Sequence, residues 1–574
     1  MQTPWIHAYP PGVRWDAELP QCSPLDLLAN ATWRWPERTA VDFMERRISY
    51  RELSNLVDRA ATGLQRLGVG PGIHVGLLLP NAPHYLIAFF AVLRAGGCVV
   101  NYSPLDADEV IAHKIEDSDT DILVTLDLAT LYPKAVNLLS RTRLRSLVVG
   151  SLGEFCERPE AVQARLEQQG QLSRVHYNHR CLPFTHLLSN DGHYHAHPLG
   201  DAARQLAVLQ YTGGTTGLSK GAMLSQANLA AAVAQVVATN VTADTDDHRR
   251  LHEGRESVLA VLPLFHVYAM VCAMLFPIAI GAEIVLMAKF DPLALLGEIQ
   301  QRRITCFPGV PTMFTALASH PEVERFDLSS LKVCVSGGAP LPLELLQRFQ
   351  ALTGCPLSEA WGMTETTACG TFTPTDGLRK PGSCGIPQPG LRLRLLDLDD
   401  PERDAADGCS GEIAVAGPNV TLGYWKQPEA SLDSFTADGF FRTGDVGRLD
   451  ADGYLYIVDR TKDMLLCGGF NVYPRVIEEA IYAHPAVEEV MVVGIPDAYR
   501  GQSPKAYIKL RRDQPPFGLE QLKEFLADRV GKHEMVQALE FRAELPKTAV
   551  GKLSKKLLLD EIAATPSAPA SASA

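Results

Sequence analysis

The sequence contains 574 residues, of which 46% are hydrophobic, 21% charged and 7% aromatic. This balance is that of a soluble globular protein and excludes a fibrous or intrinsically disordered chain. Acidic residues outnumber lysine and arginine by 66 to 53, and the net charge of -13 argues against nucleic acid as a partner, because such binding depends on phosphate contacts. The 12 cysteines form no C-x-x-C pair and no secretory signal follows Met1, so we expect free thiols and a cytoplasmic location.

The first 205 residues alternate between helical and extended apolar patterns. Helices are predicted over Tyr50–Leu67, His84–Ala95 and Asp108–Ser118, and strands over His74–Leu79, Cys98–Tyr102, Ile122–Leu126 and Leu144–Val149. This alternation predicts an α/β fold in which helices cover a mainly parallel sheet.

A connection over residues 151–206 interrupts the alternation. It carries six histidines, His176, His179, His186, His193, His195 and His197. Their number leaves a metal site open, but no H-E-x-x-H helix is present and the flanks are polar, which favours histidines on the surface of a loop.

A second run of strands and helices extends to about residue 459. Within it, the stretch from Ser257 to Ala282 has no charged residue and is long enough to cross a bilayer. Two prolines and His266 divide this stretch, which favours buried core over a membrane span. The predicted elements are strands over Val258–Leu262 and Glu283–Met287 and a helix over Val267–Phe276. Peripheral contact with a membrane stays open.

These patterns predict a large domain over residues 1–459 and a small α+β domain over residues 460–562. The large domain would contain two mainly parallel α/β subdomains, about 1–205 and 206–400, and a small β-barrel, about 401–459, where glycines separate short extended pieces. In the small domain, helices are predicted over Pro474–Ala483, Leu519–Val530 and Leu553–Ile562, and strands over Glu488–Gly494 and Ala506–Leu510. The composition of residues 563–574 predicts a disordered tail.

The strongest local motif is the run Tyr211–Gly221, which follows an apolar strand. Its glycines allow successive backbone N–H groups to point at one anion, its threonines add hydroxyl donors, and Lys220 adds a positive charge. A phosphate-binding loop is therefore predicted, with an ordinary glycine-rich turn as the alternative. A Walker A loop is disfavoured, because Gly221 stands where a serine or threonine would bind magnesium.

This loop resembles the phosphate loop of the adenylate-forming superfamily, which includes acyl-CoA synthetases, luciferases and peptide-synthetase adenylation domains. The resemblance continues, in the order of the family, through Gly337–Pro340, Trp361–Glu365, Arg442–Asp445, Asp459–Asp463, Gly469–Pro474 and Pro546–Lys552. It covers the chain from about Thr39 to Leu558 and is most similar to bacterial long-chain fatty-acid–CoA ligases. It implies ATP-dependent activation of an acid to an acyl-adenylate, followed by transfer of the acyl group to coenzyme A.

The resemblance implies a set of nucleotide-binding residues. The β- and γ-phosphates would be held by Thr212, Gly213, Gly214, Thr215, Thr216, Gly217 and Lys220. Gly338, Ala339 and Trp361 would line adenine, Asp445 and Arg460 would hold the ribose, and Thr364 would contact the α-phosphate. Glu365, with the hydroxyl of Thr212, would bind Mg²⁺, which prefers oxygen ligands.

Four further residues receive roles from the same resemblance. Lys552 would be the catalytic ammonium that stabilises the adenylation transition state. Lys462 would be the hinge about which the mobile small domain rotates, Gly469 would line the coenzyme A tunnel, and His266 would lie at the carboxylate end of the acyl pocket. Without the motifs, Lys552 and Glu365 would be interpreted as surface residues, Trp361 and His266 as core, and Asp445 as part of a turn.

Three segments depart from the family pattern. Ser219 stands where proline is usual, Gly468 replaces a common serine beside the thiol tunnel, and Gly531–Val536 replaces a Tyr-Lys-x-Pro turn. The last departure affects the expected orientation of the small domain, whereas Lys552 is retained.

We therefore expect an ATP-, Mg²⁺- and coenzyme A-dependent ligase for medium to long fatty acids. An aryl- or branched-acid–CoA ligase remains an alternative, because the length of the acyl pocket is not encoded in a motif. A peptide-synthetase module is disfavoured because little sequence follows Lys552, and a non-catalytic fatty-acid or acyl-adenylate-binding protein because Lys552, Glu365 and Asp445 are intact. A homodimer stays open.

Overall fold

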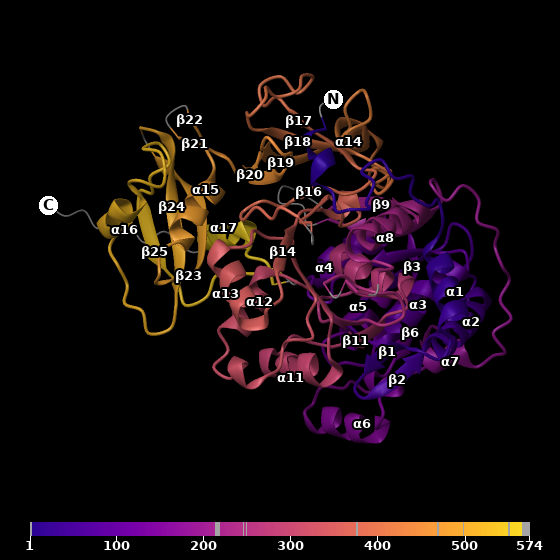
Figure 1. Cartoon of the computed structure of the whole chain (residues 1–574). Helices are drawn as coiled ribbons and strands as arrows, with labels where there is room; N and C mark the ends of the chain where they lie inside the picture. Colours follow the sequence, from indigo (N-terminus) through magenta and orange to yellow (C-terminus); the bar gives the residue numbers. More distant parts are fainter. Residues whose placement is uncertain are drawn as a thin grey trace.

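The structure is a computed structural model that describes residues 3–212, 219–244, 246–247, 249–374, 377–467, 470–497, 499–548 and 551–564. Two seven-stranded sheets with their helices make up most of the molecule, and a smaller lobe at the carboxyl end lies to one side of them (Figure 1). The predicted α/β fold class, with a large N-terminal domain and a small C-terminal one, is confirmed.

The first sheet has the strand order β7-β6-β5-β3-β4-β8-β9. Its strands are β3 (His74–Leu77), β4 (Cys98–Asn101), β5 (Thr120–Leu126), β6 (Ser146–Gly150), β7 (Cys181–Pro183), β8 (Leu206–Tyr211) and β9 (Gly221–Ser225). The pairs are parallel except for β8 with β9, the hairpin that flanks the glycine–threonine loop. The associated helices are α2 (Tyr50–Arg66), α3 (Pro83–Arg94), α4 (Asp108–Asp117) and α5 (Tyr132–Arg141). Helix α3 is buried along almost its whole length because nearly all its side chains are apolar.

The second sheet has the order β14-β13-β12-β10-β11-β1-β2. Its strands are β1 (Thr39–Phe43), β2 (Arg46–Ser49), β10 (Ser257–Ala260), β11 (Glu283–Leu286), β12 (Cys306–Gly309), β13 (Val333–Gly337) and β14 (Leu357–Ala360). The associated helices include α1 (Pro24–Arg34), α8 (Gln226–Asn240), α11 (Pro292–Arg302), α12 (Pro311–Ala318) and α13 (Leu343–Thr353). The early strands β1 and β2 thus belong to this sheet, while β8 and β9 belong to the first. The limit expected near residue 205 therefore does not separate the two sheets, because strands that are distant along the chain pair across it.

The uncharged stretch from Ser257 to Ala282 is buried core. After β10 it continues as one run of helical turns, composed of α9 (Val267–Ala269), the π-helical segment η3 (Met270–Leu275) and α10 (Phe276–Ala279). This agrees with the predicted helix. In the part of the chain that the structure describes, no helix combines the length and apolarity needed to span a membrane.

The segment expected to form a small barrel, about 401–459, joins one earlier strand in an antiparallel sheet of four strands. These are β17 (Arg392–Leu396), β18 (Gly411–Ala416), β19 (Phe441–Leu449) and β20 (Leu455–Arg460), paired in chain order. Among the described residues, no hydrogen-bonded pair joins β17 to β20, so the barrel prediction is wrong in its closure. Closure is not needed because one face of the sheet is already buried against Trp5, Trp361 and Ile386.

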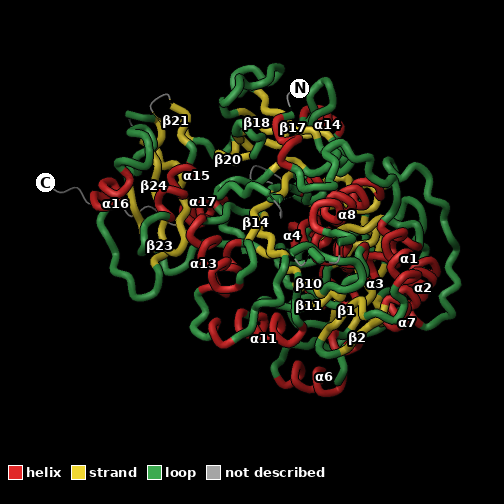
Figure 2. Tube along the Cα trace, viewed as in Figure 1, coloured by secondary structure: helices red, strands yellow, loops and turns green. Residues whose placement is uncertain are grey.

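The C-terminal lobe has a core of its own. Its elements are β21 (Leu465–Cys467), β22 (Phe470–Val472), α15 (Pro474–Tyr482), β23 (Val487–Asp497), β24 (Gly501–Leu510), α16 (Leu519–Leu526), β25 (Ala538–Phe541) and α17 (Lys555–Ala564). Figure 2 shows these strands and helices as a layer beside α13 and β14 of the large domain. The tail from residue 565 lies outside the described residues.

The histidine-rich connection contains short elements that its polar composition did not indicate, α6 (Pro159–Gln168) and α7 (Phe184–Leu188). Within the described ranges, no group of three or more His, Cys, Asp or Glu side chains is arranged to hold a metal ion.

Candidate active site

Trp361, Asp445 and Arg460 form one hydrogen-bonded unit. Asp445 on β19 lies directly opposite Arg460 on β20 in the antiparallel pair. The Trp361 indole donates to Asp445 Oδ2 at 2.8 Å, and Arg460 Nε forms an ion pair with Asp445 Oδ1 at 2.9 Å. The charge of Asp445 raises the pKa of Arg460. Three of the residues assigned to the adenosine part of a nucleotide are therefore brought together.

Glu365 is a buried carboxylate in the 3-10 turn η5 (Thr364–Thr366). The Tyr424 hydroxyl donates to its Oε1 at 2.8 Å. Burial raises the pKa of Glu365, while the hydrogen bond from Tyr424 and the charge of Arg460 lower it. Glu365 is thus within electrostatic reach of the unit formed by Trp361, Asp445 and Arg460. Thr364, at the start of η5, is half-buried.

Tyr424 is a contact of Glu365 that the sequence did not indicate, because it lies in a single β-bridge with the distant Ala222 and carries no distinctive local pattern. The ammonium of Lys220 lies 4.8 Å from the centre of the Tyr424 ring, which places Lys220 near the partner of Glu365. Thr212 N donates to the carbonyl of Lys220 at 2.9 Å, so the two ends of the glycine–threonine loop are held together. The described residues do not include Gly213, Gly214, Thr215, Thr216 and Gly217.

Lys552 reaches from the C-terminal lobe to Gly338 of the large domain. Gly338 follows β13 with a φ of 78°, a left-handed conformation that favours glycine. A Cβ atom at Gly338 would overlap Cε and Nζ of Lys552, so the lysine occupies the space that the missing side chain leaves. Burial and then the positive charge of Arg460 lower the pKa of Lys552 to about 8. Ala339, the next residue after Gly338, is half-buried.

His266 is a neutral imidazole near Lys552. Burial, and then the charge of Lys552, lower the pKa of His266 to about 3. Its Nδ1 accepts a hydrogen bond from the backbone N–H of Tyr268 at 3.2 Å. A neutral ring that accepts at Nδ1 carries its proton on Nε2, so His266 can act as a hydrogen-bond donor through that atom.

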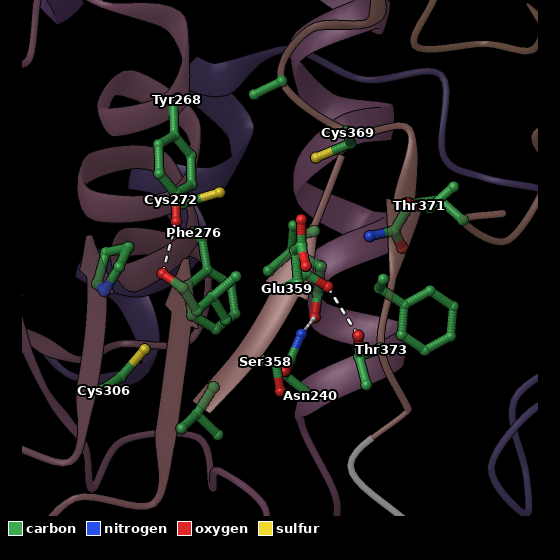
Figure 3. Close-up of a pocket in the computed structure, with 18 of the residues that line it drawn as sticks. Asn240, Tyr268, Cys272, Phe276, Cys306, Ser358, Glu359, Cys369, Thr371 and Thr373 are labelled. Atoms are coloured by element: carbon green, nitrogen blue, oxygen red, sulfur yellow. Dashed lines mark hydrogen bonds between the residues drawn. The ribbon is translucent and has the colours of Figure 1, made fainter. Parts of the chain in front are cut away.

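A narrow cavity of about 70 Å³ lies beside this region, between α8, the η3 turn and strands β12 to β14 (Figure 3). Its wall is largely apolar, and Figure 3 shows the sulfurs of Cys272 and Cys369 facing one another across it. Tyr268, also in the wall, donates to the Val335 carbonyl at 2.9 Å, and a Cβ on Gly337 would lie 3.1 Å from its ring. Tyr268 therefore lies between the cavity and Gly337, the residue that precedes Gly338.

Glu359 lines the same cavity and also contacts the C-terminal lobe. Arg475 Nη2, on α15, lies 3.8 Å from Glu359 Oε1, and both side chains are buried. Burial raises the pKa of Glu359 to about 7, and the charge of Arg475 opposes this increase. No local pattern indicates this pair, because its partners lie on different domains.

Lys462 lies in the exposed turn that directly follows β20. Gly469, with Gly468, lies outside the described residues. The unusual segment Gly531–Val536 is nonetheless integrated into the lobe. Arg500 Nη2 donates to the carbonyl of His533 at 2.6 Å, and Val536 is buried in the lobe's core.

Comparison with known proteins gives consistent matches over both domains. Residues 28–425 match the family described as AMP-binding enzyme, and residues 476–552 match the AMP-binding enzyme C-terminal domain. A long-chain-fatty-acid–CoA ligase of Bacillus subtilis (strain 168) is 36% identical over 569 residues, with 98% of each chain covered.

Two solved structures are similar over almost the whole chain. ATP-bound MatB from Rhodopseudomonas palustris is 28% identical with a TM-score of 0.79, covering 94% of this chain and 98% of that one. An anthranilate–CoA ligase in complex with anthranoyl-AMP is 25% identical with a TM-score of 0.81, covering 95% and 98%. The large α/β domain and the small C-terminal lobe of this chain thus correspond to the two parts that the family models match. The chain belongs to the AMP-binding enzyme family, and the resemblance found in the motifs is confirmed.

Proposed function

We propose that this chain is a fatty-acid–CoA ligase. In the first half reaction a fatty acid and ATP form an acyl-adenylate and pyrophosphate, and in the second the thiol of coenzyme A takes the acyl group and AMP leaves. The observation that carries the proposal is the approach of Lys552 to Gly338, within reach of the charge of Arg460. The name of the Bacillus relative supports a long-chain fatty acid as the substrate.

The first half reaction brings a carboxylate to the α-phosphorus of ATP, where negative charge develops. The Lys552 ammonium would stabilise this charge between the two reactants, Thr364 would donate to the α-phosphate, and His266 would donate to the carboxylate through Nε2. Each oxygen of the Asp445 carboxylate keeps a lone pair beyond its bond to Trp361 or Arg460, so it can still accept from ribose hydroxyls. Trp361, Gly338 and Ala339 would then line the adenine.

The phosphates would lie against the glycine–threonine loop. Thr212, Lys220 and the intervening residues 213–217 would hold the β- and γ-phosphates through backbone N–H groups, hydroxyls and one ammonium. ATP as the nucleotide is supported by the similarity to ATP-bound MatB.

Magnesium fits the residues around Glu365. The carboxylate is buried, its Oε1 accepts from the neutral Tyr424 hydroxyl, and among the described residues no lysine or arginine forms an ion pair with it. A hard divalent cation prefers such an oxygen donor, and the Thr212 hydroxyl would be a second one. When bound, the ion would neutralise charge on the polyphosphate.

For the second half reaction, the small domain, residues 460–562, would rotate on the large domain, residues 1–459. Lys462 directly after β20 would be the hinge, and Gly469 would let the pantetheine arm of coenzyme A pass close to the backbone. Such a rotation would withdraw Lys552 from Gly338. A cytoplasmic location fits these reactants and the 12 free cysteines.

A ladder of acids tests the proposal. We expect ATP-dependent pyrophosphate release with straight-chain fatty acids of medium to long chain. Ligand pockets typically have a volume of about 300 Å³ or more, and the volume of this cavity is smaller. Binding of a long chain therefore requires movement of the lining side chains, such as Phe276. Release with aryl acids alone would favour the aryl-acid ligase instead. Tight binding of fatty acids without any release would favour a non-catalytic binding protein.

A second expected result concerns pH. Lys552 must be an ammonium to act, and its pKa of about 8 lies below the ordinary 10.5 because its charged form is disfavoured by burial and by Arg460. The fraction of active enzyme therefore falls as pH rises through about 8. We expect kcat/KM for ATP, which reports groups of the free enzyme, to decrease about tenfold per pH unit above that value.

Lys552→Arg is the control for the pH profile, because a guanidinium keeps its charge throughout this range. Its residual activity should show no decrease between pH 8 and pH 10. A wild-type profile that stays level up to pH 10 would contradict the role of a buried ammonium.

A further inference from the structure

Thr312 is a residue of the large domain that no nucleotide motif includes. It occupies the second position of α12, and its Oγ1 donates to the backbone carbonyl oxygen of Gly551 at 2.8 Å. Gly551 directly precedes Lys552. A hydroxyl of one domain thus holds the peptide group that leads into the catalytic lysine of the other.

The loop that carries Lys552 is closed by its own backbone. Thr548 N donates to the carbonyl of Lys552 at 2.7 Å, and Gly551 N donates to the carbonyl of Thr548 at 2.9 Å. The amide of Lys552 in turn donates to Thr548 Oγ1 at 3.2 Å. Because the loop is short and cross-linked in this way, fixing the carbonyl of Gly551 also fixes the Cα atom of Lys552.

The close fit at Gly551 makes this contact specific. Gly551 has a φ of 77°, and a Cβ there would lie 3.2 Å from Thr312 Oγ1 and 3.7 Å from a methyl group of Val310. On the other side, Met313, Phe314 and Leu317 bury α12 in the large domain. Thr312 therefore presents its hydroxyl from a rigid element, as precise positioning requires.

Other contacts between the lobe and the large domain act far from Lys552 along the chain. Arg475 contacts Glu359, and Arg511 Nη2 contacts Glu344 Oε2 at 2.6 Å. These ion pairs join other segments of the lobe to the large domain and do not touch the loop around Lys552. A shift of about 1 Å at a reacting group can cost about a hundredfold in rate, so the position of the loop matters.

We infer that Thr312 is a positioning residue for adenylation, which holds the loop of Lys552 so that the ammonium lies over Gly338. The inference rests on the proposed function. Thr312 does not touch the reactants, and its hydroxyl acts only while the lobe is docked as in this structure. It should therefore affect the first half reaction and not the second.

The test compares Thr312→Val with Thr312→Ser. Valine keeps the shape and removes the donor, whereas serine keeps the donor. We expect fatty-acid-dependent exchange of pyrophosphate into ATP to fall by about fivefold to tenfold in Thr312→Val, the effect of one neutral hydrogen bond. Thr312→Ser should recover most of this rate, and both variants should form acyl-CoA from supplied acyl-AMP as the wild type does.

Thr315→Val is the matched control, since Thr315 lies one turn further along the same helix and should leave both half reactions unchanged. In a Lys552→Ala background, Thr312→Val should have no further effect on exchange. A full effect in that background, equal loss of both half reactions, or a serine variant as slow as the valine variant would each overturn the inference. If Lys552→Ala itself kept full exchange activity, the proposed function would fail, whatever the result at Thr312.

Discussion

Replacing Lys552 with alanine is expected to slow formation of the acyl-adenylate by about a thousandfold, the loss seen when a preorganised donor to a developing negative charge is removed. Lys552 is the residue of the small lobe whose ammonium lies over Gly338, near Arg460 and His266. Without it, the carboxylate and the α-phosphate would approach each other with less positive charge to offset their repulsion. The measurement is fatty-acid-dependent exchange of pyrophosphate into ATP.

The second half reaction provides the internal control for Lys552→Ala. Supplied with acyl-AMP and coenzyme A, the variant should form acyl-CoA at the wild-type rate, because rotation of the lobe would withdraw this lysine before the thiol attacks. Lys523→Ala should leave both halves unchanged, since that ammonium forms its ion pair with the exposed Glu520 on the same helix. Equal loss of the two half reactions in Lys552→Ala would contradict the assigned role.

Local pattern was enough to predict much of the fold. The helix predicted over Tyr50–Leu67 and the strand over His74–Leu79 agree with α2 and β3 within a few residues, because apolar spacing reports which face of an element is buried. The membership of β1 and β2 in the second sheet could not be predicted from local pattern. Strand β2 pairs with β1, but the other partner of β1, β11, lies more than two hundred residues away, and pairing at that distance leaves no local periodicity.

The candidate site likewise contains residues that the motifs indicated and residues that no local pattern indicated. The motifs supplied Trp361, Asp445, Glu365 and Lys552 by their order along the chain, and the structure brings the described ones into one region. They could not supply Tyr424 or Thr312, whose contacts exist only after distant elements meet. A glycine in a motif also does not reveal which side chain occupies the space beside its Cα atom. At Gly338 that side chain is Lys552, which belongs to the other domain.

Gly338→Ala should therefore displace the side chain of Lys552. The added methyl group would overlap Cε and Nζ of Lys552, and since these are the far end of a flexible side chain, the lysine would move while the fold persists. We expect adenylation to fall by about a hundredfold, the cost of a displacement of roughly 1 Å at a reacting group. The left-handed φ of 78° should add a loss of stability of about 1 kcal/mol.

Gly354→Ala separates these two effects. Gly354 ends α13 with a φ of 71°, and a Cβ there would meet nothing within 4 Å. Both variants should show a similar decrease in thermal midpoint, because both place alanine in the left-handed region, but only Gly338→Ala should lose pyrophosphate exchange. Combining Gly338→Ala with Lys552→Ala should then slow exchange no further than Lys552→Ala alone, since the methyl group has no ammonium left to displace. An additional hundredfold loss in the double variant would mean that the methyl group acts through the adenine that Gly338 would line, and not through displacement of Lys552.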